Sequence, residues 1–151
     1  MTVDFARRRG RVLGVDLGLQ RTGLALSDEL GLTTRGLDNL VPRSRAEDVA
    51  FLVALCREHG VVDVAVGLPL MPRSGDDSPM ARRARGFAAA LDDALKAAGL
   101  DVFVHLVDER GTSKEAAQRL VASDTKKRRR KELIDSEAAR LLTEDVLARR
   151  R

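Results

Sequence analysis

Two apolar runs joined by a glycine-bounded turn form the clearest pattern along the chain. The first run begins at Arg11, is almost wholly apolar like a strand buried on both faces, and carries Asp16 near its end. Gly18 and Gly23 then allow a tight reversal into a second apolar run at residues 24–26. A buried carboxylate is costly unless it is paired, hydrogen-bonded or bound to a metal, so we expect Asp16 at the mouth of a cleft.

The remaining pattern predicts a third strand and then alternating helices and strands. Ser44 and Ser78 have the spacing of helix N-caps, whereas Gly60 and Gly99 stand where helices are expected to end. A second capping box begins at Thr112. We expect strands over 33–40, 61–66 and 101–107, helices over 44–60, 78–99, 112–122 and 132–148, and a loop over 123–131.

This order of elements predicts an α/β fold built on a mixed five-stranded sheet. Three adjacent strands pair antiparallel, two further strands join in parallel through crossover helices, and helices cover both faces. That is the order of a ribonuclease H-like fold. We find no internal repeat or domain linker, so residues 1–151 are expected to form a single ribonuclease H-like domain. Residues 1–10 and 148–151 are expected to be mobile basic tails.

Composition narrows the classes of function. The 151 residues are 44% hydrophobic but only 3% aromatic, without Trp or Tyr, which disfavours base-stacking platforms. A formal net charge of +4 favours a polyanionic partner. Cys56 cannot form an internal disulfide and is expected to be inert core, and His59 and His105 lack a matching set of metal ligands. No apolar run has the length of a membrane span, so we expect a soluble intracellular protein.

Three carboxylates can reach one end of the predicted sheet. Asp16 lies on the first strand, and Glu109 follows the last one. Asp135 lies three, four, seven and eleven positions before apolar residues of the last helix, so it shares their sheet-facing stripe. Three converging carboxylates repel each other unless a hard cation binds them, and oxygen ligands favour Mg²⁺ or Mn²⁺. Two such ions can activate water and stabilise a phosphodiester under attack, which predicts a metal-dependent nuclease.

Each of these acids has a simpler alternative. Asp16 alone would fit a turn cap, Glu109 a surface ion pair with Arg110, and Asp135 a helix N-terminus. The basic run before Asp135 would fit either a solvated loop or a phosphate-binding segment. This run consists of Lys126, Lys127, Arg128, Arg129, Arg130 and Lys131.

Five segments together resemble a known family. They are residues 14–28, 66–69, 87–91, 108–113 and 131–139, which occur in order and at family spacing within residues 11–147. They are similar to the YqgF family, also called RuvX, bacterial proteins regarded as nucleases of pre-16S ribosomal RNA and as Holliday junction resolvase homologues. The resemblance implies a ribonuclease H-like fold, a cytoplasmic location and an acidic metal site at Asp16, Glu109 and Asp135. It also implies phosphate contacts by Arg21 and Arg110.

Two departures and several alternatives stay open. Residues 71–77 differ from the usual family turn, and Gly111 replaces a bulky residue. A non-catalytic RNA-binding ribosome-assembly factor would use the same basic segments. A phosphate- or ATP-binding domain of the actin-like fold would also use an early Asp-x-Gly, but no Lys-Ser or Lys-Thr follows Gly23 as a Walker pattern requires. The substrate, structured ribosomal RNA precursor or branched DNA, and the choice between monomer and homodimer are also open.

Overall fold

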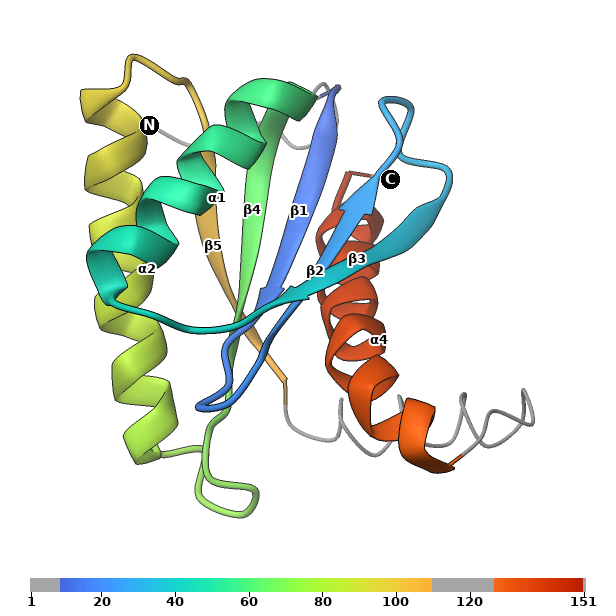
Figure 1. Cartoon of the computed structure of the whole chain (residues 1–151), viewed down its shortest axis with the longest axis vertical. Helices are drawn as coiled ribbons and strands as arrows, with labels where there is room; N and C mark the ends of the chain where they lie inside the picture. The colour runs from blue at the N-terminus through green and yellow to red at the C-terminus, as the bar shows by residue number, and fades with distance from the viewer. Residues whose placement is uncertain (1–8, 110–126, 151) are drawn as a thin grey trace.

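The computed structural model describes residues 9–109 and 127–150, with the backbone alone for residues 127–135. Its five strands form one sheet in the order β3-β2-β1-β4-β5 (Figure 1). β1 pairs antiparallel with β2, and β2 with β3, whereas β4 pairs in parallel with both β1 and β5. The predicted fold class is confirmed. The strands are β1 (Arg11–Asp16), β2 (Thr22–Ser27), β3 (Thr34–Leu40), β4 (Val61–Leu68) and β5 (Phe103–Asp108).

Helices cover both faces of the sheet. α1 (Arg45–His59) and α2 (Pro79–Ala97) lie on one face, and α4 (Lys127–Ala148) lies on the other (Figure 1). The larger apolar core, which includes Leu13 and Val66, fills the space under α1 and α2. Val12 packs on the opposite face with Leu142 of α4. Because neighbouring residues of a strand point to opposite faces, every second residue of β1 faces α4.

The expected helix caps are present. The Ser44 hydroxyl accepts a hydrogen bond from the Glu47 amide at 3.1 Å, and Ser78 accepts one from the Ala81 amide at 3.0 Å. Gly60 ends α1 with a φ of 64°, a conformation that glycine adopts without strain. These local signals therefore fix where α1 begins and ends and where α2 begins.

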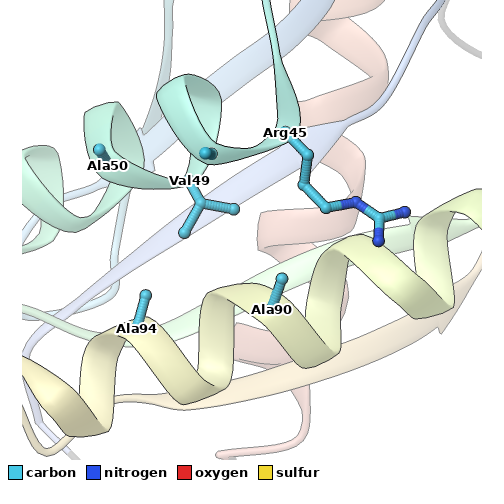
Figure 2. Close-up of a pocket in the computed structure, with 6 residues that line it drawn as sticks. Arg45, Val49, Ala50, Ala90 and Ala94 are labelled. Atoms are coloured by element: carbon cyan, nitrogen blue, oxygen red, sulfur yellow. The ribbon is translucent and has the colours of Figure 1, made fainter.

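The packing of α1 against α2 leaves a shallow apolar hollow of about 520 Å³ between the helices. Figure 2 shows Val49 of α1 above Ala90 and Ala94 of α2, with Arg45 reaching along the rim.

On α1, Cys56 is buried, and this burial raises the pKa of its thiol to about 12. The thiol therefore stays protonated, which confirms that Cys56 is inert core.

The basic run differs from the expected loop. α4 begins at Lys127, so five of the six basic residues lie within its first turns rather than in a loop before residue 132. Lysine and arginine lose little side-chain freedom in a helix, and this propensity outweighs the run's hydrophilic character. The predicted helix over 112–122 and residues 1–8 lie outside the described residues. Within the described part of the chain, no helix is long and apolar enough to cross a membrane.

The C-terminal end of α4 is hydrogen-bonded to the sheet near the amino-terminal ends of β1 and β4. Arg150, which the sequence places in a mobile tail, instead donates one hydrogen bond to the Gly10 carbonyl at 2.9 Å and another to the buried carboxylate of Asp63. His105 of β5 also contacts Asp63, at 2.8 Å. α4 therefore runs antiparallel to β1, with its beginning at the carboxyl end of that strand.

A row of small residues lets α4 lie close to the sheet. Gly36, Ala25, Gly14 and Ala65 are successive partners across β3, β2, β1 and β4. A Cβ atom on Gly14 would lie only 2.2 Å from the Ala139 carbonyl oxygen of α4. The α4 backbone therefore rests directly on β1 at Gly14, with the Thr143 hydroxyl beside it.

We expect Gly14→Ala to lower the free energy of unfolding by about 3 kcal/mol, because the added methyl group meets backbone that cannot rotate away. Urea denaturation at neutral pH measures this loss. Gly86→Ala is the matched control, since its Cβ would meet only the Arg45 guanidinium, at 2.9 Å. That control should raise stability by up to about 1 kcal/mol through helix propensity. Equal effects of the two substitutions would contradict the close packing of α4.

Candidate active site

Two of the predicted acids meet at the carboxyl ends of the parallel strands. Asp16 is the last residue of β1, and Glu109 directly follows β5. The Glu109 amide donates a hydrogen bond to the Leu68 carbonyl at 3.2 Å, which fixes the backbone beside the end of β4. Asp16 lies four residues after Val12, so both side chains share the face covered by α4. The carboxyl groups of Asp16 and Glu109 are joined by a hydrogen bond.

Glycines make room for this pair of carboxyl groups. A Cβ on Gly67 would lie 2.2 Å from the Glu109 Oε2 atom, so only glycine lets Glu109 lie over β4. On the other side, Gly23 is the cross-strand partner of Asp16. Asp16 thus has a residue without a side chain opposite it on β2, which leaves open space beside its carboxylate. The sequence pattern assigns Gly23 to the turn and gives Gly67 no role.

The pair carries an electrostatic cost. Burial raises the pKa of Glu109, the negative charge of Asp108 adds to this rise, and the hydrogen bond with Asp16 opposes it. A carboxyl group in such a position holds its proton to higher pH than a free glutamate. The donor set consists of carboxylate oxygens that need positive charge nearby, and this fits a hard divalent cation.

The third predicted ligand is placed by its backbone. Ala139 of α4 lies over Gly14 of β1, and the two elements run in opposite directions. Residue 135 precedes Ala139 by one helical turn, a rise of about 6 Å. Asp16 follows Gly14 by two strand residues, a rise of about 6.6 Å. The Asp135 backbone is therefore level with Asp16, whereas its side chain lies outside the described residues.

A polar seam sets the rotation of α4 about its own axis. The buried Ser136 hydroxyl donates to the Leu37 carbonyl at 3.2 Å and lies 2.8 Å from the Asn39 side-chain oxygen. One turn later, Arg140 donates to the Thr34 hydroxyl at 3.2 Å. Sequence patterns do not reveal this seam, although Ser136 stands out as a polar residue next to the apolar stripe. Because Asp135 directly precedes Ser136, these contacts also hold the Asp135 backbone in place.

The predicted phosphate-binding residues are placed only in part. Arg21 lies at the end of the turn after β1, where it lines a hollow with Met80 of α2. Arg110 and Lys126 lie outside the described residues, and the side chains of 127–131 are likewise not described. Among the side chains that the structure does describe, no three His, Cys, Asp or Glu residues form a cluster. A three-carboxylate site therefore depends on Asp135.

Gly18 allows the tight reversal that the sequence predicts, although not through a left-handed backbone. The described glycines with positive φ are Gly10, Gly31, Gly60, Gly75 and Gly99. A Cβ on Gly18 would instead lie 2.1 Å from the Arg21 carbonyl oxygen. Glycine is needed here because the turn folds back on itself at close range.

Comparison with known proteins then assigns the family. The family model described as "RuvX: Holliday junction resolvase" matches residues 10–149. The chain belongs to the RuvX family. A relative from Anaeromyxobacter dehalogenans, named "Putative pre-16S rRNA nuclease", is 43% identical over 140 residues, covering 93% of this chain and 98% of its own. A relative of the same name from Koribacter versatilis is 38% identical, covering 93% of this chain and 88% of its own.

Solved structures agree with this RuvX fold. RuvC of T. thermophilus, in complex with a Holliday junction substrate, matches with a TM-score of 0.52 at 19% identity and covers 93% of this chain and 95% of that one. The yeast mitochondrial Holliday junction resolvase Ydc2 matches with a TM-score of 0.52 at 15% identity, covering 93% of this chain and 78% of that one. At these identities the likeness establishes the ribonuclease H-like fold alone, and it agrees with the strand order predicted from sequence.

The raised pKa of Glu109 predicts a pH dependence of stability in metal-free protein. The folded state holds the Glu109 proton to higher pH than the unfolded chain, whose glutamate pKa is about 4.3. This contribution is therefore fully present below about pH 4.3 and is lost as the pH rises through the folded pKa. We expect Glu109→Gln to be more stable than wild type at pH 7 in EDTA, with the difference vanishing towards pH 4.

Urea denaturation at several pH values measures this difference. Asp101→Asn removes an exposed carboxylate at the opposite end of β5 and serves as the control. A Glu109→Gln profile parallel to the wild-type profile would show that Glu109 carries no such cost.

Proposed function

We propose that this RuvX protein is a divalent-metal-dependent nuclease that cleaves ribosomal RNA precursor, with Asp16, Glu109 and Asp135 as metal ligands. The observation that carries the proposal is the hydrogen-bonded pair of Asp16 and Glu109 carboxyl groups at the carboxyl ends of β1 and β5. The family description and the names of the relatives both denote nucleases, which hydrolyse phosphodiester bonds.

Ribosomal RNA precursor is favoured over branched DNA by the degree of likeness. The relatives named for pre-16S rRNA match 93% of this chain at 43% and 38% identity. The solved resolvases match at only 19% and 15% identity, and this likeness supports the fold alone. Holliday junction cleavage, named in the family description, is the second candidate. We also propose a cytoplasmic location; a monomer or a homodimer would fit the proposal equally.

The described residues suit Mg²⁺ or Mn²⁺. Asp16 and Glu109 offer only oxygen ligands, and burial raises the pKa of Glu109, so that a bound cation would favour its ionised form. Two ions at these carboxylates would supply an activated water and would stabilise charge on the phosphate. Asp16 is held on a central strand, and Glu109 is held by the backbone contact with Leu68, so both carboxylates are fixed before substrate arrives.

Cationic residues close to the acids would hold the substrate. Arg21 is five residues beyond Asp16, and residues 127–131 occupy the turns of α4 that precede Asp135. Their charges would bind phosphates of the substrate, and the carboxylates would hold the metal ions at the phosphate that is cleaved. This division predicts that rate and affinity can be separated by mutation.

A non-catalytic RNA-binding assembly factor is the alternative that the same basic residues would serve. It needs no acidic pair, so the acids distinguish the two functions. The actin-like alternative has less support, because the family model and the relatives at 43% and 38% identity are named for nucleases.

We expect Asp16→Asn to lose at least about a hundredfold in cleavage rate while RNA binding changes little, because the metals stabilise charge mainly in the transition state. The assay uses purified protein with Mn²⁺ on a ribosomal RNA precursor fragment, a four-way DNA junction and a plain duplex. Ca²⁺, with its looser geometry, should support binding but little cleavage.

Two further variants make this assay decisive. Cys56→Ala should stay active, since its buried thiol plays no part in the chemistry. Asp135→Asn should abolish most of the rise in melting temperature that Mn²⁺ gives the wild type. Full cleavage by Asp16→Asn, or an undiminished metal response in both carboxylate variants, would contradict the proposed mechanism.

The basic segment gives a separate prediction. Replacing residues 127–131 with glutamine keeps helix propensity but removes the charges. Affinity for RNA should fall, and the plot of log affinity against log salt should flatten by roughly 0.7 for each single-strand phosphate that the protein no longer neutralises. The Mn²⁺ response should be unchanged. Unaltered affinity and slope would show that this segment only faces solvent.

A further inference from the structure

A hollow lies at the carboxyl end of β1, between the turn that follows this strand and α2. It has a volume of about 400 Å³ and is lined by Gly18, Leu19, Gln20, Arg21 and Met80. Leu19 follows Asp16 by three residues, so their Cα atoms lie within about 11 Å of each other. The hollow therefore lies at the same end of the sheet as the carboxylates, on the side of α2.

The loop that forms one wall of the hollow is anchored at both ends. Gly18 packs so closely against the Arg21 carbonyl that a Cβ would lie 2.1 Å from its oxygen. From α2, Arg83 donates a hydrogen bond to the Gly18 carbonyl at 3.2 Å. These contacts fix the backbone on both sides of Leu19 and tie the loop to the helix that carries Met80.

Leu19 is the most exposed large apolar side chain in the described part of the chain, at 76%. Single exposed leucines are ordinary on protein surfaces, and Leu30 and Leu32 are both 72% exposed. What distinguishes Leu19 is its setting. It projects from an anchored loop between a carboxylate and an arginine, and it shares a hollow with Met80.

An apolar side chain beside a cation suits one occupant, a nucleotide. Its phosphate is attracted by arginine, and its base offers an apolar face. Structured RNA keeps its bases stacked, whereas cleavage requires one phosphate to reach the carboxylates. Leucine and methionine are among the apolar residues that proteins insert between bases to unstack them. The chain has no Trp or Tyr for this purpose.

We propose that Leu19 and Met80 form an aliphatic wedge that contacts the base of the nucleotide next to the cleaved phosphodiester, while Arg21 contacts its phosphate. The proposal rests on the nuclease function proposed above and adds to it a determinant of substrate choice. It makes an unstacked nucleotide beside the cleaved bond part of what the protein recognises.

The test combines protein and substrate changes. The cleaved bond is first mapped on end-labelled RNA precursor, and RNAs with an abasic nucleotide on either side of that bond are then prepared. Leu19→Ala should lower kcat/KM on intact RNA about tenfold, in line with the removal of one base contact. On one of the two abasic RNAs, wild type should fall to the level of the variant, and Leu19→Ala should lose nothing further. Met80→Ala should behave in the same way, with a smaller loss.

Leu30→Ala is the matched control, an equally exposed leucine in the turn between β2 and β3, at the opposite end of β2 from Asp16. It should keep wild-type kcat/KM and the full abasic penalty. The Mn²⁺-induced rise in melting temperature should be unchanged in every variant, because no metal ligand is altered. If Leu19→Ala matches Leu30→Ala, or if the abasic penalty is equal in wild type and Leu19→Ala, the wedge is disproved.

A binding experiment separates failure of the wedge from failure of the nuclease proposal. RNAs with 2-aminopurine at successive positions are titrated with protein in Ca²⁺, which requires no cleavage. A rise in fluorescence at one position, absent in Leu19→Ala and kept in Leu30→Ala, supports the wedge even if wild type cleaves none of the substrates. Absence of any position-specific rise overturns the wedge, whereas cleavage that depends on Asp16 would still uphold the nuclease.

Discussion

The direct contact between the α4 backbone and the sheet is the constraint on which the rest of the molecule depends. At Gly14 the α4 backbone lies directly on the strand, at Gly36 only the small Ser136 side chain lies between, and the alanines beside them add little height. A helix lying this close cannot slide or rotate without a steric clash. The arrangement therefore determines which residues of α4 are level with which residues of β1, and so brings position 135 level with Asp16.

Electrostatics at the site works against the folded state. Asp16 and Glu109 are held close together, and burial, with a smaller contribution from the charge of Asp108, raises the pKa of Glu109. The packing of α4 and the hydrogen bonds at Ser136 and Arg140 supply the rigidity that keeps the acids together. Stability provided by the rest of the domain thus maintains a group of charges that would separate if they were free to move, which is typical of catalytic sites.

Sequence patterns predict the features that depend on short-range chemistry. The order of strands and helices along the chain, the caps at Ser44 and Ser78, and the apolar stripe of α4 follow from periodicity and local hydrogen bonding, and the described residues confirm them. The start of α4 is not predicted correctly, because a run of like charges favours a loop while the helix propensity of the same residues favours a helix. The roles of Gly23 and Gly67 escape prediction because each is set by a neighbour on another strand, and pairing register is not written in local sequence.

The attachment of Arg150 means that the face of the sheet under α4 is covered last as the chain is made. The strands are made first, whereas α4, which brings position 135 and ends in the contact with Asp63, is made after all five of them. Until α4 emerges from the ribosome, one face of the sheet lacks its cover, and the first two acids lack their neighbour on the helix. In a chain with this topology, position 135 joins Asp16 and Glu109 only after every strand of the sheet has been made.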